Sequence, residues 1–588
     1  MSRVSNSDHA APAQQADTPG RRARKIAEQR RATSTRTAST CPACGETLTH
    51  TPGKVAKTYC SATCRQRAKR TAGKGSAGPQ PVTLGSKGRK FPDPEPVRTA
   101  ATAGLSDDVA EAMASELGKV SERTRRNWVS LYRQWSRSGL KSVRGCRRGA
   151  RDQGAGVTYV HTGDHTATKG VTRCASVWAC PVCEGVIRRG RADDVDKALV
   201  EHIRRGGTAY FVTLTSRHWA NHDLADLLTA QLTTVFKGRL ISGRRWARST
   251  EGGLRDRLGV VGTIRVVEVT VGPWNGWHPH IHLVILMGGR QDPKPPRGSG
   301  VKWDPTVRSY FKPKRKDLTE LRRQWTNDWI SGLTAVNPDF KPSRTRGVDF
   351  KLIEAVPEAE KVAKYVTKLQ GSDSGAWSVG MEMSQADLKA SRGENLKPMD
   401  LLHRLTRLEG GEVPEDVPGW GSRVQLSALW MEYELATRGR QNMAWSEGLK
   451  RAYGITSDED QDAADRGAVD MEDEAGGDRY VHVPAKVKRD IAARRVELEA
   501  RAAAAGGAEV LRAFLGSVGV GFAGVRDLTA DEDAEKWAAV KKRDEVKRPD
   551  RASSRARNAE RLEGEHRAAL ETAATTRREV MTRWNWTA

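Results

Sequence analysis

The chain has 588 residues and a formal net charge of +27, from 99 lysines and arginines against 72 aspartates and glutamates. Such an excess favours a polyanionic partner, most simply nucleic acid, although a basic tail on an unrelated enzyme gives the same total. Apolar residues make up only 37%, which indicates that part of the chain lies outside any packed core. The sequence contains no signal peptide and no run of roughly 18 apolar residues, so we expect a cytoplasmic protein without membrane contact.

The first 120 residues place a compact cysteine unit between two polar segments. Residues 1–40 are predicted to be a disordered basic arm, and residues 71–120 a linker followed by the start of a helical region. The segment 41–70 has the spacing C-x2-C-x15-C-x3-C, formed by Cys41, Cys44, Cys60 and Cys64. In a reducing compartment cysteines are more often metal ligands than disulfide partners, so we predict structural Zn²⁺ here.

A second zinc site is expected in the helical region 121–200. Its candidate ligands are Cys146, Cys174, Cys180 and Cys183, the last two in the knuckle CPVC. Cys146 is the most economical fourth ligand because it leaves no cysteine unassigned, and His161 and His165 are the alternatives. Both cysteine groups offer four protein ligands, which is typical of structural rather than catalytic zinc.

From residue 205 the pattern changes to short strands mixed with helices. Alternating, β-branched segments predict strands at 209–216, 263–271 and 280–287. Helical periodicity follows at 219–237, 316–332 and 358–370. Strands and helices in this order indicate an α+β fold.

Three histidines, His278, His280 and His282, alternate within residues 276–286, which read GWHPHIHLVIL. On a strand they share one face, where they could converge on a cation or form an ordinary polar sheet surface. Glu268 precedes the turn-like segment GPWNGW, so an antiparallel hairpin could bring its carboxylate beside the imidazoles. Such a group would suit catalytic Mg²⁺ or Mn²⁺, with Zn²⁺ as an alternative.

A helix is predicted over residues 357–370, which read PEAEKVAKYVTKLQ. Lys361, Tyr365 and Lys368 then fall on one face, with the tyrosine between two cations. Adjacent positive charge favours the phenolate, a competent nucleophile. The same spacing also describes a solvated lysine face with an ordinary tyrosine.

Three segments, in this order, resemble the motifs of rolling-circle plasmid replication initiators, which belong to the histidine-hydrophobe-histidine (HUH) superfamily of single-strand DNA endonucleases. They are FVTLTS (211–216), GWHPHIHLVIL (276–286) and KYVTK (364–368). The resemblance is closest to initiators of actinobacterial plasmids. It extends through RCASVWACPVC (173–183) and ATRGRQNMAWSEGL (436–449), so that it covers roughly residues 140–455.

The resemblance implies a central five-stranded antiparallel sheet that carries the metal ligands, flanked by helices. By position, Tyr365 corresponds to the nucleophile that forms a 5′-phosphotyrosyl bond and leaves a free 3′-OH as primer. His280 and His282 correspond to metal ligands, with His278 or Glu268 as the third.

The positive charge of Lys368 could offset negative charge that develops on the phosphoryl group. Some relatives carry a glutamate one helical turn before the tyrosine, whereas this chain has Lys361 there and Glu360 next to it. Hydrolytic termination of a replication round is therefore not supported by this helix.

The expected function is metal-dependent nicking and joining of single-stranded or extruded origin DNA, with host helicase and replication proteins as partners. One alternative is a single-tyrosine transposase or relaxase of the same superfamily. Another is a non-catalytic zinc-finger DNA-binding regulator. The expected domains are a catalytic domain at 205–375, a helical extension at 376–456, and an acidic linker with a charged helical or disordered tail at 457–588.

Overall fold

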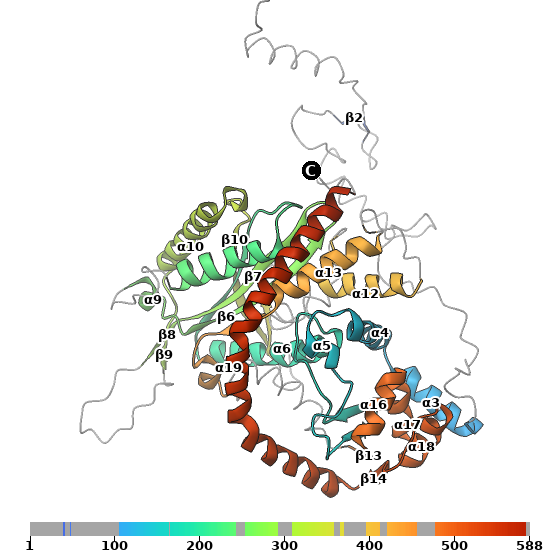
Figure 1. The fold of residues 1–588 in the computed structure, drawn as a ribbon. Helices are drawn as coiled ribbons and strands as arrows, with labels where there is room; N and C mark the ends of the chain where they lie inside the picture. The colour runs from blue at the N-terminus through green and yellow to red at the C-terminus, as the bar shows by residue number, and fades with distance from the viewer. Residues whose placement is uncertain are drawn as a thin grey trace, which may run out of the picture. The chain divides into compact units, whose positions relative to one another are not determined.

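The computed structural model divides the chain into two units, Met1–Glu95 and Pro96–Ala588 (Figure 1). It describes residues 39–40, 47–48, 105–163, 165–242, 253–291, 308–357, 365–369, 395–411, 420, 422–455 and 477–583. In the first unit the described residues form one antiparallel pair, β1 (Ser39–Thr40) with β2 (Thr47–Leu48). The four cysteines of the predicted first zinc site lie outside the described residues.

An antiparallel six-stranded sheet forms the centre of the second unit. Its strand order is β11-β10-β5-β7-β6-β12. The strands are β5 (Thr208–Thr215), β6 (Gly262–Gly272), β7 (Gly276–Met287), β10 (Val348–Pro357), β11 (Tyr365–Leu369) and β12 (Met443–Trp445). The predicted α+β class and five-stranded antiparallel sheet are confirmed for β11 to β6, and the short β12 adds a sixth strand at the edge.

The β6–β7 hairpin is set by side-chain alternation and by its turn. Val267, Ile281 and Leu283 point into the main core and are fully buried, so the opposite face receives the residues between them. Gly272 pairs with Gly276 across the turn. Gly276 has φ +69°, and a Cβ there would approach the Ala220 Cα to 2.8 Å, which favours glycine at this position.

Helices cover the apolar face of this sheet and share its core. They are α4 (Glu122–Arg137), α7 (Leu224–Leu228), the π-helix η1 (Thr229–Ile241), α10 (Arg315–Val336), α12 (Pro398–Glu409) and α13 (Arg423–Thr437). Helices thus occupy most of the predicted ranges 219–237 and 316–332, and α12 and α13 lie within the range expected for the helical extension. Shorter elements are α5 (Lys141–Gly145), α9 (Leu254–Arg257), β8 (Gly289–Gln291), β9 (Arg308–Tyr310), η2 (Pro338–Phe340) and α14 (Leu449–Ala452).

The opposite, histidine-bearing face is partly covered by α6 (Pro181–Arg204). Val195, Ala198 and Leu199 of this helix pack in one cluster with Ile264 of β6 and Val284 of β7. One end of this sheet face is therefore closed by apolar packing, while the other end carries the polar side chains of the site.

The helix predicted over 357–370 is wrong where the chain is described. Residues 365–369 form β11, in which Tyr365 pairs with Pro357 and Lys368 pairs with Glu354 of β10. The β-branched Val366 and Thr367 suit a strand, and β10 offers hydrogen bonds that outweigh a short helical period. Tyr365 and Lys368 are three residues apart and share a helix face but not a strand face, so the argument that grouped them no longer applies. Lys361 lies outside the described residues.

A second antiparallel sheet joins segments that are far apart in the sequence. Its order is β14-β13-β3-β4, with strands β3 (Val157–Thr162), β4 (His165–Lys169), β13 (Arg479–Val483) and β14 (Arg526–Leu528). The helices around its core are α3 (Asp107–Lys119), α16 (Ala485–Arg494), α17 (Glu497–Ala505) and α18 (Ala508–Ser517). Within the tail expected at 457–588, residues 485–517 are helical, but the strands β13 and β14 that flank them were not expected. Alanines such as Ala500 and Ala503 give these helices a buried core, which the low overall apolar content does not reveal.

The charged helix expected near the C-terminal end is α19 (Ala530–Arg583), which contacts β13 and β14 at one end and α13 at the other (Figure 1). Its Arg577 is buried and donates from Nη1 to the Ala220 carbonyl oxygen at 2.6 Å and from Nη2 to Asp223 Oδ1 at 2.8 Å. This helix thus ties the second sheet to the central one. None of the helices that the structure describes is long and apolar enough to cross a membrane.

Candidate functional site

Glu268, His280 and His282 form a compact group on the open end of the histidine-bearing face. Glu268 and His280 are direct cross-strand partners in the β6–β7 hairpin. Glu268 Oε2 lies 2.9 Å from His280 Nε2 and 3.0 Å from His282 Nε2. One carboxylate and two imidazoles that converge in this way are a suitable donor set for a divalent cation.

The surroundings of this group keep the Glu268 carboxylate ionised and the His282 ring oriented. Burial on its own raises the pKa of the Glu268 carboxyl, but the His280 and His282 rings outweigh it and hold that pKa well below its usual range. The Nδ1 atom of His282 is 3.3 Å from the Thr213 hydroxyl, so the threonine of the first motif orients the ring from β5. The ionised carboxylate and the fixed ring are both properties that a metal site requires.

His278 lies apart from this group. Its ring stacks on that of His218, with centroids 4.5 Å apart, and its centroid is 5.2 Å from that of His280. Burial, followed by the charges of His280 and His218, lowers the pKa of His278 to about 3. Of the two candidates for the third ligand, the structure therefore brings Glu268, and not His278, into contact with the other two.

Sequence reasoning missed His218. This residue follows β5 by three positions, and its Nδ1–H donates to the Asn275 carbonyl oxygen in the β6–β7 turn at 2.9 Å. Burial lowers its pKa, so it stacks on His278 as a neutral ring. Its position directly after the threonine motif was a possible signal, but nothing in the local pattern pairs it with a turn some 60 residues away.

Four cysteines of the second predicted zinc site meet at the start of α6. Cys146 Sγ is 3.5 Å from Cys183 Sγ and 3.7 Å from Cys180 Sγ, and Cys174 Sγ is 3.7 Å from Cys183 Sγ. They are free thiols, and all four sulfurs lie within 4.8 Å of one another. The alternative ligand His161 instead shares a hydrogen bond with the Thr166 hydroxyl at 3.1 Å.

This cysteine cluster suits a cation better than four neutral thiols. Burial and neighbouring thiols raise the pKa of Cys180 well above its usual range, whereas hydrogen bonds from the other thiols hold the pKa of Cys183 well below it. The fold thus favours one thiolate, and several thiolates in so small a space require a positive ion that compensates them. Cys180 also caps α6, because its sulfur accepts from the Cys183 backbone N–H at 3.5 Å. The cluster therefore fixes where α6 begins.

Helix α6 connects the cysteine cluster to the carboxylate–histidine group. Two turns along it, Arg188 lies 2.6 Å from the buried carboxylate of Glu184. Both residues line a small cavity together with Glu268 of β6 and Lys397, which precedes α12. The cysteine cluster, itself a candidate metal site, thus fixes the start of the helix that lies beside the carboxylate–histidine group.

The strand β11, which carries the tyrosine of the third motif, lies away from this group. Tyr365 pairs with Pro357 of β10, whereas His282 lies opposite Thr213 of β5, which pairs with Asp349 of β10. At about 3.3 Å per residue, the interval from Asp349 to Pro357 spans roughly 26 Å along the sheet. The described structure therefore does not bring Tyr365 and Lys368 together with the carboxylate–histidine group.

Comparison with known proteins gives two informative relatives. The chain is 38% identical over 380 residues to "Protein rep" of Streptomyces lividans, covering 60% of this chain and 80% of that protein. It is 30% identical over 316 residues to "Neomycin resistance protein" of Streptomyces cyanogenus, covering 49% of this chain and 70% of that protein. No family model and no solved structure matches the chain.

Proposed function

Because the chain belongs to the family of the Streptomyces lividans Rep protein, we propose that it is a plasmid replication initiator. Its reaction is site-specific nicking and joining of one DNA strand at the plasmid origin. The observation that carries this proposal is the convergence of Glu268, His280 and His282 on one end of an antiparallel sheet. The substrate is single-stranded origin DNA or an extruded hairpin, which agrees with the net charge of +27.

The carboxylate–histidine group is the proposed holder of Mg²⁺ or Mn²⁺. When bound, such a cation polarises a phosphoryl oxygen and orients the scissile bond. Glu268 supplies the negative charge, and Thr213 fixes the ring of His282 through Nδ1 so that Nε2 faces the site. His278 and His218 form a neutral aromatic wall beside the group.

Tyr365 is the proposed nucleophile, on the strength of its place in the third motif. Its phenolate oxygen attacks the phosphorus, and the bond from phosphorus to the 3′ oxygen breaks. The DNA 5′ end remains on the tyrosine, while the released 3′ oxygen takes up a proton and becomes the primer. Because β11 lies along the sheet from the metal group, this step requires Tyr365 to leave its place in β11 when DNA binds. Lys368 is the proposed counter-charge for the phosphoryl group.

The remaining parts of the chain support this reaction. The cysteine cluster of Cys146, Cys174, Cys180 and Cys183 is proposed to hold structural Zn²⁺, and the N-terminal cysteine group to hold a second. The sequence carries no P-loop, so unwinding falls to a host helicase, and the host replication proteins extend the primer. The proposed setting is the cytoplasm.

Incubation of the full chain with Mn²⁺ and single-stranded DNA spanning the plasmid origin, followed by denaturing electrophoresis, tests the proposal. The wild type is expected to give a covalent protein–DNA band. Tyr365→Phe removes the attacking oxygen and is expected to abolish that band while origin binding persists. Tyr210→Phe is the matched control, because Tyr210 lies on β5 but alternates to the face opposite Thr213.

An adduct that survives in Tyr365→Phe refutes the nucleophile assignment. Absence of any adduct in the wild type, with DNA binding intact, favours the non-catalytic regulator instead.

A further inference from the structure

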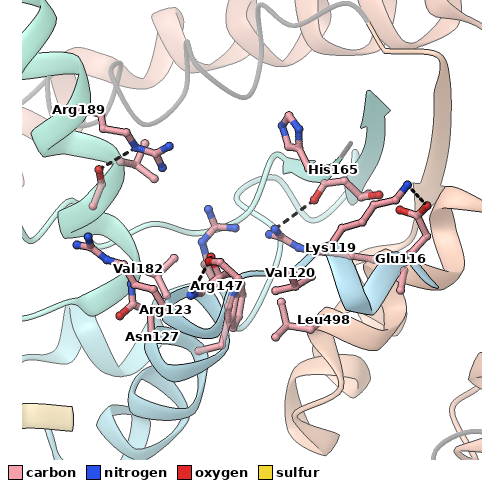
Figure 2. Close-up of a pocket in the computed structure, with 18 of the residues that line it drawn as sticks. Glu116, Lys119, Val120, Arg123, Asn127, Arg147, His165, Val182, Arg189 and Leu498 are labelled. Atoms are coloured by element: carbon pink, nitrogen blue, oxygen red, sulfur yellow. Dashed lines mark hydrogen bonds and ion pairs between the residues drawn. The ribbon is translucent and has the colours of Figure 1, made fainter. Parts of the chain in front are cut away.

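A cavity lined by several arginines is not used by the proposed reaction. This basic cleft has a volume of about 660 Å³ and lies between α4 and α6 on one side and α3, β4 and α17 on the other (Figure 2). Its cationic lining residues are Lys119, Arg123, Arg147, Arg188, Arg189 and Arg501. Figure 2 shows Arg123 and Arg147 between Arg189 on α6 and Lys119 on α3.

The charge of the basic cleft is unbalanced. Among its described lining residues Glu116 is the one carboxylate, and it pairs with Lys119 at 2.6 Å. Two more carboxylates lie behind the lining, Glu184 against Arg188 at 2.6 Å and Glu497 against Arg501 at 3.3 Å. The described lining itself therefore presents six cations and one carboxylate, which favours an anionic ligand with several charges.

The basic cleft is built to present guanidinium groups and not an aromatic ring. Trp128 is only 2% exposed, and the guanidinium carbons of Arg147 and Arg501 lie 5.5 Å and 5.2 Å from its ring centroid. These cation–π contacts orient the two arginines but leave no open ring face for a base to stack on. A ligand is therefore recognised through its phosphates, independently of base sequence.

Arg188 links the basic cleft to the carboxylate–histidine group. Its side chain lines both this cleft and the small cavity that contains Glu268. A strand that crosses the basic cleft is therefore led along α6 toward the metal group. The volume is that of a site for a small ligand, which suits a short stretch of one strand and is too small for a duplex.

We propose that the basic cleft binds the phosphodiester backbone of the single DNA strand that runs to the Glu268–His280–His282 group. This inference rests on the proposed function, because that function supplies the strand.

Binding of a fluorescein-labelled oligothymidylate to the full chain, measured by anisotropy at several salt concentrations without Mn²⁺, tests the inference. The test variant is the pair Arg123→Ala and Arg189→Ala. The matched control is the pair Arg323→Ala and Arg451→Ala, two exposed arginines outside the cleft. Each phosphate contact on a single strand contributes about 0.7 to the slope of log affinity against log salt, so the test pair should lower this slope by about 1.4.

The charge-preserving pair Arg123→Lys and Arg189→Lys should restore the slope, which separates a lost contact from a misfolded cleft. Zinc content and circular dichroism of each variant check the fold. A slope that stays at the wild-type value in the alanine pair, or falls equally in the control pair, overturns the proposal. A loss that appears only with a duplex probe overturns the assignment to a single strand.

Adduct formation by the wild type distinguishes the two proposals. A wild type that forms the adduct while the cleft variants bind oligothymidylate normally refutes the basic cleft and leaves the nicking function standing. A wild type that forms no adduct, but whose oligothymidylate binding depends on Arg123 and Arg189, retains the cleft as a single-strand site and refutes the nicking function.

Discussion

Arg577, near the end of α19, and Glu432, in the middle of α13, form a buried ion pair in which Arg577 Nε lies 2.6 Å from Glu432 Oε2. Both side chains are 1% exposed. The same Glu432 oxygen accepts from Trp277 Nε1 at 2.8 Å, directly before His278 on β7. The other oxygen accepts from the Leu224 backbone N–H at 2.8 Å. One carboxylate thus joins the C-terminal helix to the strand that carries the histidines.

Arg577→Ala is expected to destabilise the second unit by about 3–5 kcal/mol, because it leaves Glu432 buried without its cation. Thermal unfolding measures the loss in the free energy of unfolding. Limited proteolysis shows whether α19 is released. Arg578→Ala is the control. That neighbour pairs with Asp223 at the surface, where its side chain is 44% exposed, so its removal should cost less than about 1 kcal/mol. Equal effects of the two substitutions would contradict the assignment.

The loss caused by Arg577→Ala should grow with pH. Burial raises the pKa of Glu432, and the charge of Arg577 opposes that rise. A carboxyl whose pKa is higher in the folded state binds its proton preferentially there, so ionisation destabilises the fold as pH rises above about 4.3. Removing Arg577 raises the pKa of Glu432 further, so ionisation of this carboxyl destabilises the variant over a wider pH range than the wild type. Melting temperatures of variant and wild type should therefore differ less at pH 5 than at pH 8, and a constant difference would argue against this cause.

Mn²⁺ binding should distinguish Glu268 from His278. Glu268→Gln removes a ligand charge from the group and is expected to weaken Mn²⁺ binding by at least about tenfold, as measured by calorimetry. His278→Ala should change it by much less, because its ring stacks on His218 outside the three-residue group. If instead His278→Ala gives the larger loss, His278 and not Glu268 is the third ligand.

Zinc content should identify the fourth ligand of the cysteine cluster. Cys146→Ser is expected to release about one Zn²⁺ per chain, because the three remaining thiols leave the tetrahedral site open. His161→Ala should retain the wild-type zinc content, since this ring bonds to Thr166. Metal analysis of both purified variants decides the matter, and the opposite pattern would return His161 to the ligand set.

The sequence predicts those parts of the molecule in which interacting residues are close along the chain, or in which few residues of the required type are available. The β6–β7 hairpin follows from alternation on either side of one turn, and that geometry alone puts Glu268 opposite His280. Cys146 was predicted by elimination, since three cysteines required a fourth. In both cases few alternatives compete, so the sequence constrains the outcome.

Long-range pairing could not be predicted in the same way. The strand at 479–483 pairs with β3, more than 300 residues earlier, and no local signal selects that partner. The alanine-rich helices beside it lack the apolar stripe that marks a core helix. The segment around Tyr365 shows the opposite case. Its sequence has a helical period, but in the structure it pairs as a strand with β10.

The second sheet also constrains the order in which the chain can fold during synthesis. Strands β3 and β4 emerge early, but β3 acquires its neighbour β13 only after residue 483 has been made. Until then β3 exposes the hydrogen-bonding edge that β13 later covers, on the side away from β4. Translation that stops within the acidic segment 457–476 therefore yields a chain with its histidine strand in place and this edge unprotected, a product prone to aggregation.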